Sequence, residues 1–479
     1  MTETILVIAV RSFWGVFLGC LLSAGFRQSW NVEHGGKRGW AMNRPDTAVW
    51  MDPVVFPVIL ALYMVLYVCF FGVSYGIEYM LSMSIDILVF ISLYFTLLLA
   101  ALPLLRRYYT ARTCATLWLI PVFLFYQPNL LYNLRTGPPL AVLYIPGQIM
   151  KAALLVWIAG FVLLFGLQVL THLRFSRMLE RHSAPALDEE KELWEKIRRD
   201  LEVDLPVRLR RSPLIRTPLT AGMRKKNRVT YLPERTYTPL EAELVFAHEL
   251  HHIQRNDTHT KFFLCFCRAF GWIHPFVWTA VRRAEDDLEL SCDEIVLKDA
   301  DAETRRKYAE LLLATAGDSR GFTTCLSASA RSLRYRMRAT IRAEGRRLGT
   351  GLLFAIMFLS VFSTGWIAVS SSRASVAEIL DLEESGLSDV SVAAGDKGEK
   401  DVGDTEKLTA CMTEFEAEEM LWKYTALPEL PGPVLTGLLP QKGSFRLTDR
   451  YLEVRIWGKQ PRLYHLTEPV DWAQMEAIE

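Results

Sequence analysis

The sequence lacks several features that would indicate a common class of protein. It carries no excess of one charge, since 54 Lys and Arg stand against 53 Asp and Glu, and this balance gives no argument for a nucleic-acid partner. Of its eight cysteines only Cys411 lies beyond residue 370, so the C-terminal tail has no disulfide framework. The first apolar run has no basic start and no small-residue cleavage site, which argues against a secretory signal.

Apolar residues are plentiful and are segregated from the charged ones. They make up 51% of the chain beside 22% charged residues, and the mean hydropathy is +0.16. A helix of about 20 apolar residues crosses the hydrocarbon core of a bilayer. We therefore expect a multi-pass α-helical membrane protein with an N-terminal bundle of about five spans over 1–172 and a final span over 349–370. The apolar runs lie near residues 5–26, 54–80, 85–105, 115–134, 150–172 and 349–369.

Basic residues gather in alternate loops between these runs. They lie at 27–52, 106–112, 174–181 and 331–347, and the last of these segments holds seven arginines and one acid. Cytoplasmic loops of membrane proteins are enriched in Lys and Arg. The pattern therefore predicts an N-terminus outside the cell, a cytoplasmic segment over 173–348 and an external tail.

The tail divides by composition. Residues 378–419 hold fourteen acids and three lysines, which predicts an acidic linker over 371–425. Beyond it, residues 451–457 alternate in polarity as a half-buried strand does. We therefore expect residues 426–479 to form a small, β-containing external module.

The residues with the clearest chemistry lie in segment 238–255, which is predicted to form one helix. Thr238 suits the N-cap, Pro239 suits the first helical position, and Glu241 suits the third position of a capping box. Towards the end of this helix the sequence reads His248-Glu249-Leu250-His251-His252.

Two histidines of this motif are placed to bind one metal ion. His248 and His252 are four residues apart, so they lie on one face of the helix and can bind the same zinc ion. Glu249 lies one step round the helix, where its carboxylate can take a proton from the water that the ion activates and deliver it to the leaving amine. His251 could share a face with His248, but only the 248/252 pair has the glutamate correctly placed. The alternative is a surface helix that happens to hold acids and imidazoles.

A catalytic zinc needs a third protein ligand, and Glu289, in an acidic predicted helix, is the best candidate. Asp293, one turn further on, could accept the other ring N–H of a ligating histidine, and Asp257 is assigned a similar supporting place. These acids could instead form a solvated helix face. His259 and His274 could ligate by residue type, although a structural place is favoured for both. The prediction is one Zn²⁺ per chain.

Upstream of the motif, residues 218–233 look like two short strands around a turn, with 228–232 as an edge strand. An extended peptide could add to such an edge through main-chain hydrogen bonds. An ordinary hairpin fits the same residues equally well.

These segments together resemble a known family, the BlaR/MecR-type membrane metallopeptidases, which are antirepressor transducers of the beta-lactam response. The resemblance implies an α+β zincin domain of the gluzincin type, with His248, His252 and Glu289 as zinc ligands. It implies that Glu249 is the base. Family members cleave a cytoplasmic repressor, or themselves, after a signal from outside. The resemblance covers about residues 205–300 and is carried by Pro218-Leu-Thr-Ala-Gly222, Tyr231-Leu-Pro233, Ala247-His-Glu-Leu-His-His-Ile-Gln-Arg-Asn-Asp257, Trp272-Ile-His-Pro275 and Glu289-Leu-Ser-Cys-Asp293.

The chain departs from the family in its tail. The best-known members end in a penicillin-binding sensor domain with a Ser-x-x-Lys nucleophile. About 109 residues follow the predicted last span here, which is too few for that domain, and they contain no Ser-x-x-Lys. We therefore expect no sensing of beta-lactams by acylation, and the external ligand is unknown.

The patterns and the resemblance predict a zinc-dependent metalloendopeptidase of a bacterial cell membrane. Its expected substrate is a cytoplasmic transcriptional repressor, cleaved in response to an external signal, and no direct binding of nucleic acid is expected. Self-cleavage is predicted within 314–330, where small residues indicate an exposed loop. Two alternatives stay open: a membrane transducer that signals by conformation and does not cut, and a housekeeping protease resembling the Ste24/HtpX group.

Overall fold

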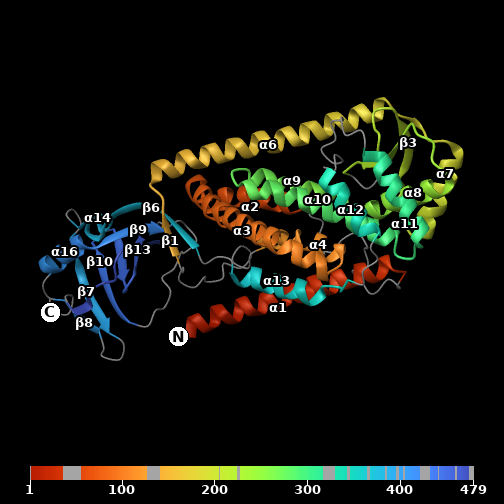
Figure 1. The fold of residues 1–479 in the computed structure, drawn as a ribbon. Helices are drawn as coiled ribbons and strands as arrows, with labels where there is room; N and C mark the ends of the chain where they lie inside the picture. The colour runs from red at the N-terminus through yellow and green to blue at the C-terminus, as the bar shows by residue number, and fades with distance from the viewer. Residues whose placement is uncertain are drawn as a thin grey trace.

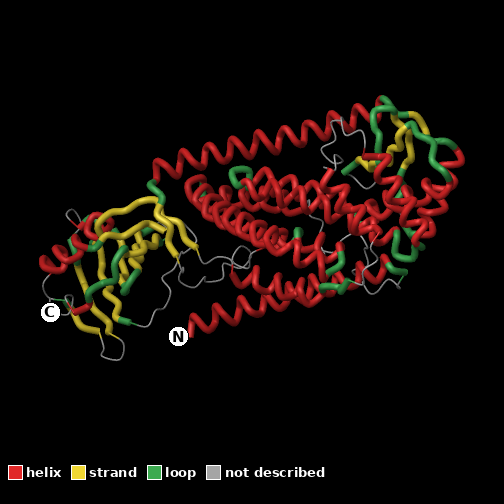
Figure 2. Tube along the Cα trace, viewed as in Figure 1, coloured by secondary structure: helices red, strands yellow, loops and turns green. Residues whose placement is uncertain are grey.

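The computed structural model contains three regions (Figures 1 and 2). Long helices fill the middle, a small sheet with helices lies at one end, and a larger sheet lies at the other. The structure describes residues 2–35, 55–126, 141–203, 205–223, 227–316, 330–341, 346–363, 367–382, 386–394, 399–402, 405–420, 432–440, 442–458 and 461–473.

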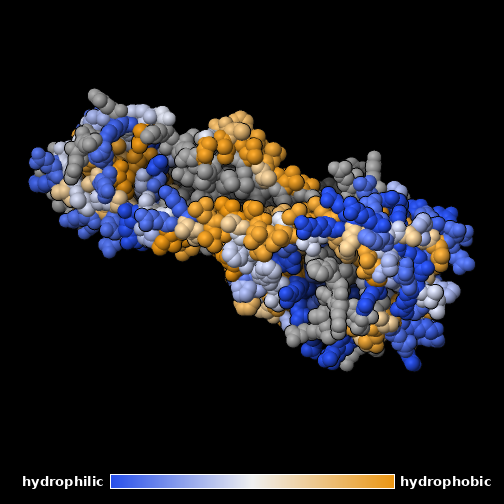
Figure 3. Space-filling view, turned by 90° about the horizontal axis from the view of Figure 1, so that it is seen from above, coloured by the Kyte–Doolittle hydropathy of each residue, from blue (hydrophilic) through white to orange (hydrophobic). Residues whose placement is uncertain are grey.

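Within the described residues, three helices are long and apolar enough to cross a membrane. They lie in α1 (Thr2–Glu33), α3 (Val73–Tyr108) and α6 (Gly147–Arg181). α6 runs along the outside of the molecule, and its apolar side chains are exposed: Leu155 is 68% and Val162 is 61% accessible. Figure 3 shows hydrophobic residues across the middle of the molecule, between two hydrophilic ends. The middle region therefore has the surface that a lipid environment favours.

The second and third predicted spans differ from the structure in where the chain breaks. α2 (Val55–Phe71) ends at Gly72, whose φ of 87° is a left-handed conformation that interrupts a helix. α3 then continues through the predicted loop at 81–84, because that segment contains neither Gly nor Pro to end it.

The first and fifth predicted spans lie within the longer helices α1 and α6, whereas the fourth and the last overlap shorter helices. The fourth begins as α4 (Ala111–Leu117) and the 3₁₀ helix η1 (Ile120–Tyr126), and its residues 127–134 lie outside the described part of the chain. The last begins as α13 (Thr350–Ser363), which packs along α1 (Figure 1). The prediction of one helix over 349–370 is wrong at its end, because residues 367–370 belong to the strand β6 (Ile367–Ser375). The number of six spans and their orientation stay predictions.

The helical region shares its core with two helices that follow the small sheet. These are α9 (Asp257–Phe270), which packs against α6, and α10 (Pro275–Val296), which packs against α3 and α4. Residues from both groups of helices form one buried cluster, which includes Phe95, Trp118, Phe263 and Val277. α10 is therefore fixed against apolar helices of the middle region.

The small sheet has four strands in the order β2-β3-β5-β4. β5 (Val229–Pro233) is buried throughout, because it pairs in parallel with β3 (Arg208–Ser212) and antiparallel with β4 (Leu219–Ala221). The prediction that 228–232 forms an edge is wrong, and the edge strand is β4. The nearly continuous apolar run of β5 is typical of an interior strand. β2 (Ala184–Pro185) forms the other edge.

Helices surround this sheet and complete its core. α7 (Asp188–Asp200), α8 (Pro239–Gln254) and α11 (Ala302–Ala316) meet it around a buried cluster that includes Trp194, Leu232, Phe246 and Leu311. Side chains of α7, α8 and α11 thus pack against the sheet in one core, which fixes the position of α8.

The larger sheet joins two distant parts of the chain. β1 (Ala141–Tyr144), which precedes α6, pairs in parallel with β6 (Ile367–Ser375), which follows α13. The strand order is β1-β6-β9-β13-β12-β11-β10-β7-β8. The other strands are β7 (Ser388–Ala394), β8 (Glu399–Asp401), β9 (Glu416–Met420), β10 (Pro433–Leu439), β11 (Gly443–Leu447), β12 (Tyr451–Ile456) and β13 (Arg462–Leu466).

The prediction of an acidic linker over 371–425 is wrong for the residues that the structure describes. Strands β6 to β9 and the helices α14 (Val376–Leu380) and α16 (Thr405–Glu414) belong to the same folded unit as the strands beyond residue 432. Their spaced apolar side chains, such as Leu408 and Met412, are buried in its core. A count of charges over the whole segment does not reveal these buried apolar positions. The β-containing module is therefore larger than the predicted range 426–479, because it includes the described residues from β6 onwards.

Candidate metal centre

The helix that carries the motif begins as its sequence predicts. The Thr238 hydroxyl accepts a hydrogen bond from the backbone N–H of Glu241 (3.3 Å), and the Glu241 carboxylate accepts one from the backbone N–H of Thr238 (2.8 Å). This capping box satisfies two backbone donors at the start of α8. The last two turns of α8 carry His248, Glu249 and His252.

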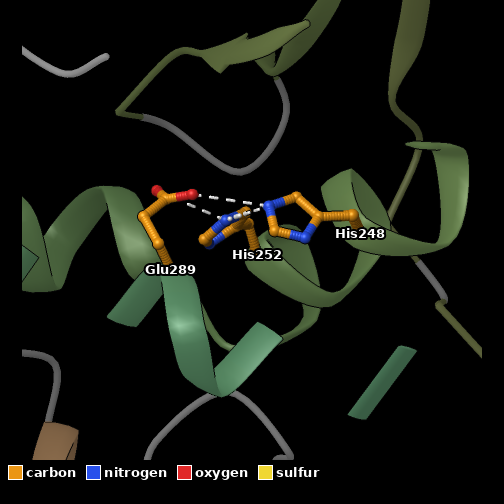
Figure 4. A group of neighbouring side chains, drawn as sticks. All are labelled: His248, His252 and Glu289. Carbon is orange, nitrogen blue, oxygen red and sulfur yellow. Dashed lines mark hydrogen bonds and ion pairs between the residues drawn. The ribbon is translucent and has the colours of Figure 1, made fainter. Parts of the chain in front are cut away.

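The two histidines and Glu289 of α10 converge on one point (Figure 4). The Nε2 atoms of His248 and His252 lie 3.1 Å apart, and they lie 3.5 and 3.6 Å from the two carboxylate oxygens of Glu289. Ligands at about 2.0–2.1 Å from a tetrahedral zinc would lie about 3.4 Å from one another. The observed spacing and the donor set of two imidazoles and a carboxylate therefore fit a zinc ion.

The opposite edge of each imidazole ring is held by an aspartate. His252 Nδ1 lies 2.7 Å from a carboxylate oxygen of Asp257, and His248 Nδ1 lies 3.4 Å from one of Asp293. Both aspartates are buried. Because each Nδ1 faces an acceptor, the Nε2 atoms are left to face Glu289, which is the arrangement that a ligating histidine needs. The structure thus brings both predicted supporting residues next to the predicted ligands.

Two further residues support Asp293, and sequence reasoning missed both. The Tyr308 hydroxyl donates to Asp293 (2.6 Å) and lies 3.0 Å from His248 Nδ1. Arg336, on α12 (Ala330–Ile341), donates two hydrogen bonds of 2.7 Å to Asp293, and its third nitrogen lies 3.3 Å from Glu289. Arg336 lies in the arginine-rich segment 331–347, whose composition predicted only the orientation of the chain in the membrane. Tyr308 stands at no recognisable spacing from the other residues of the site.

The carboxylates of the centre keep their negative charge despite burial. Burial alone would raise the pKa of Glu289, but Lys261, whose Nζ lies 3.0 Å away, and His252 hold that pKa well below its ordinary value. Burial likewise opposes ionisation of Asp293, and Arg336 outweighs it, so the pKa of Asp293 is lowered. Ionised carboxylates around two imidazoles form a site whose charge suits a cation.

The imidazoles of the centre respond to these carboxylates. Burial disfavours the protonated ring of His248, but hydrogen bonds to Asp293 and Glu289 outweigh it and raise the pKa of His248 to about 9. The pKa of His252 is also raised, against the effect of burial, by Cys292 and Glu289. A cation and a proton therefore compete for the same Nε2 atoms.

Glu249 faces the edge of the small sheet. Its carboxylate accepts a hydrogen bond of 2.9 Å from the Thr220 hydroxyl on β4, and the hydroxyls of Thr220 and Thr230 lie 2.9 Å apart. Glu249 is 7% exposed. It does not belong to the group of His248, His252 and Glu289, whose ligand atoms lie close together. Glu249 thus lies between the metal-binding residues and a strand whose outer side has no partner strand in the described residues.

Comparison with known proteins gives two matches. Residues 141–339 match the family model described as BlaR1 peptidase M56. The chain is also 28% identical over 181 residues to the regulatory protein BlaR1 of Bacillus licheniformis, a match that covers 38% of this chain and 30% of that relative. Residues 141–339 are therefore similar to the BlaR1 peptidase family. The match to the Bacillus licheniformis protein covers less than a third of that protein's length.

Two other histidines near the metal centre have structural contacts. His251 lies within hydrogen-bond distance of Gln254 (3.2 Å), and burial together with Arg255 lowers its pKa to about 3. His259 contacts Asn256 and the backbone carbonyl of Met223. Neither belongs to the group that converges on Glu289.

Cys292 was not assigned to the centre from the sequence, although it lies beside it. Its Sγ atom lies 3.4 Å from His252 Nδ1 and 3.8 Å from Asp257. These three residues also form a group with metal-ligand spacing, but they use the Nδ1 side of His252. Since Asp257 already contacts that side of His252, we interpret Cys292 as a residue that packs beside His252.

Proposed function

We propose that the protein is a membrane-anchored zinc endopeptidase of the BlaR/MecR type, with His248, His252 and Glu289 as metal ligands and Glu249 as general base. The observation that carries the proposal is the convergence of the three ligand atoms at 3.1–3.6 Å. Glu249, one residue after a ligand, supports a catalytic centre over a purely structural one, because a structural zinc site needs no base.

The residues around the metal centre have separate roles in the proposed peptide hydrolysis. The chemistry that a bound zinc ion supplies is Lewis acidity, which polarises the peptide carbonyl and makes water acidic. Glu249 takes the proton from the attacking water and passes it to the leaving amine. Asp257 and Asp293 hold the two imidazoles in the orientation that leaves Nε2 free. Thr220 holds the Glu249 carboxylate towards the substrate.

The edge of β4 is the proposed place of the substrate backbone. An extended peptide can add to a free strand edge through main-chain hydrogen bonds. β4 carries Thr220, so a peptide on its outer side would run past Glu249. This places the scissile bond of the substrate between the sheet edge and the metal ligands.

The proposed substrate is a cytoplasmic regulator, a transcriptional repressor, cleaved after an external signal. The family resemblance supports this, and the relative from Bacillus licheniformis is named a regulatory protein. The basic loops support a cytoplasmic peptidase domain, and the position of the two hydrophilic ends on either side of the hydrophobic middle supports an external β-containing module (Figure 3). The proposed self-cleavage falls within 314–330, of which 317–329 lie outside the described residues.

The decisive experiment compares the wild-type chain with Glu249→Gln in cells and as purified protein. Gln keeps the shape of the side chain and removes its basicity. We expect the variant to retain about one zinc per chain and to lose cleavage about 100-fold or more. Proteins that accumulate intact only in the variant are the candidate substrates. A variant that cleaves them as fast as wild type would exclude the proposal and favour a transducer that signals by conformation.

A further inference from the structure

We propose that a cavity between α3, α10 and α12 binds an anionic phospholipid. The cavity has a volume of about 730 Å³. Its walls are apolar where α3 faces α10, and the residues there include Leu99, Leu102, Pro103 and Phe276. It is separate from the metal centre, and the proposal does not depend on the proposed peptidase activity.

The polar part of the cavity is made of arginines from three helices. Arg106 of α3 and Arg283 of α10 line it, and both are paired with aspartates of α10: Arg106 with Asp287 (2.7 Å) and Arg283 with Asp286 (3.2 Å). These two cations are therefore largely compensated within the protein.

The uncompensated charge comes from α12. Arg334 and Arg338 line the cavity and are exposed, and neither forms an ion pair with the described residues. They are four residues apart on one helix, so their guanidinium groups lie on the same face and repel each other. An anion bound between them would relieve this repulsion and make bidentate hydrogen bonds, for which guanidinium and phosphate geometries match.

The position of the cavity favours a lipid over a soluble phosphate. It is lined by the last turns of the apolar helix Ser84–Tyr108, at the end where that helix becomes basic. Apolar side chains beside it are exposed, with Leu104 at 60% and Phe276 at 51%. Basic pockets at the cytoplasmic ends of membrane helices are typical sites for anionic headgroups. An acyl chain would lie against the apolar wall while the phosphate meets the arginines.

Two of the helices that form the cavity, α10 and α12, also contribute residues to the metal centre. Tyr335 lines the cavity and its ring lies 4.3 Å from the guanidinium carbon of Arg106. The next residue, Arg336, points to the other side of α12 and holds Asp293. Bound lipid therefore contacts the helix that supports a proposed metal ligand.

The test is lipid binding to the full-length chain in detergent, measured by native mass spectrometry. Phosphatidylglycerol, phosphatidylcholine and soluble glycerol 3-phosphate are added separately. We expect one phosphatidylglycerol per chain, with phosphatidylcholine and glycerol 3-phosphate each bound at least about tenfold more weakly. Equal binding of the two lipids, or binding of glycerol 3-phosphate as tight as that of phosphatidylglycerol, would overturn the proposal.

Two variants with a matched control locate the site. Arg334→Gln with Arg338→Gln should weaken phosphatidylglycerol binding about 30-fold, because each basic residue contributes to headgroup attraction. Leu99→Trp should fill the apolar part and also weaken it. The control, Arg306→Gln with Lys307→Gln, removes two charges from surface ion pairs on α11 and should leave binding unchanged. Unchanged binding in both cavity variants would place the lipid elsewhere and contradict the proposal.

Discussion

Arg255, directly after the metal-binding helix, is paired with Glu33, the last residue of the apolar helix α1. Two hydrogen bonds of 3.0 and 2.9 Å join the guanidinium to the two carboxylate oxygens, and both side chains are almost completely buried. The third nitrogen of the Arg255 guanidinium donates to Ser291 on α10 (2.8 Å), and Arg112 of α4 lies 3.1 Å from Glu33. One buried carboxylate thus joins α1 and α4 to the two helices that carry the metal ligands.

Replacing Glu33 should therefore destabilise the whole arrangement. Glu33→Ala leaves two buried arginines without their partner, and we expect the free energy of unfolding to fall by about 3–5 kcal/mol. Chemical unfolding of the purified chain in detergent measures this. Glu310→Ala, which removes the carboxylate of a surface ion pair with Arg306, is the control and should leave the unfolding midpoint unchanged. Equal midpoints for Glu33→Ala and wild type would contradict a structural role of the pair.

Removal of the metal should abolish peptidase activity reversibly. His252→Ala removes one of three proposed ligands, so the purified variant should contain almost no zinc, whereas the wild type should contain about one ion per chain. Elemental analysis of both proteins measures the content, and a chelator followed by added zinc tests reversibility. His182→Gln changes an exposed histidine at the end of α6 and should keep the metal. A zinc content that is equal in His252→Ala and wild type would show that the ion is bound elsewhere.

The aspartates behind the imidazoles should tune metal affinity without being ligands. Asp257→Asn keeps the size of the side chain and removes the charge that holds His252 Nδ1, so we expect affinity for zinc to fall about 10–100-fold. Competition with a chelator of known affinity measures the change. Asp299→Asn, at an exposed position after α10, should bind zinc as wild type does. An unaltered affinity in Asp257→Asn would mean that the contact does not orient the ring.

Arg336 and Asp293 should depend on each other. Arg336→Met leaves a buried carboxylate with no guanidinium beside it, although the Tyr308 hydroxyl and the His248 ring still contact it, and Asp293→Asn leaves a buried guanidinium with a weaker acceptor. We expect the double variant to be more stable than the sum of the two single losses predicts, by about 0.5–3 kcal/mol. A double-mutant cycle in chemical unfolding measures this coupling, and strictly additive losses would contradict it.

The local parts of the site were predictable from the sequence because they depend on short spacings. The capping box at Thr238 and the pairing of His248 with His252 on one helix face follow from helical periodicity, and the structure has both. The approach of Glu289 to these residues depends on how α10 packs, so the acidic predicted helix and the family resemblance named Glu289 as a candidate, but no local spacing fixed its contact with the histidines. Arg336 could not be predicted as part of the site, because its contact with Asp293 depends on how the chain brings α12 back to the metal centre. No local sequence pattern indicates that packing.

One of the larger errors in the sequence-based prediction came from averaging charge over a long segment. The acid-rich stretch 378–419 looked like a linker, yet its apolar residues recur at positions that face one core, as Leu380 and Leu408 do. Edge and interior strands are also set by pairing partners that are distant in the chain. The predicted edge at 228–232 is interior for this reason, because β3 arrives from 17 or more residues upstream to pair with it.

The contact between Thr220 and Glu249 gives a final prediction, on catalysis alone. Thr220→Val keeps the shape of the side chain on β4 and removes the hydroxyl that donates to the carboxylate. If this hydrogen bond positions the base, its loss should lower kcat about tenfold, with KM for a peptide substrate nearly unchanged, because a misplaced catalytic group slows the chemical step more than binding.

The neighbouring threonine offers the matched control for that experiment. Thr230→Val removes a hydroxyl from β5 that contacts Thr220 and leaves the bond between Thr220 and Glu249 in place. Its kcat should therefore stay close to that of the wild type, while both variants should retain zinc. Equal losses of kcat in the two variants would show that the sheet as a whole, and not the contact with Glu249, is what catalysis requires. A rise in KM alone in Thr220→Val would instead assign this residue to peptide binding at the edge of β4.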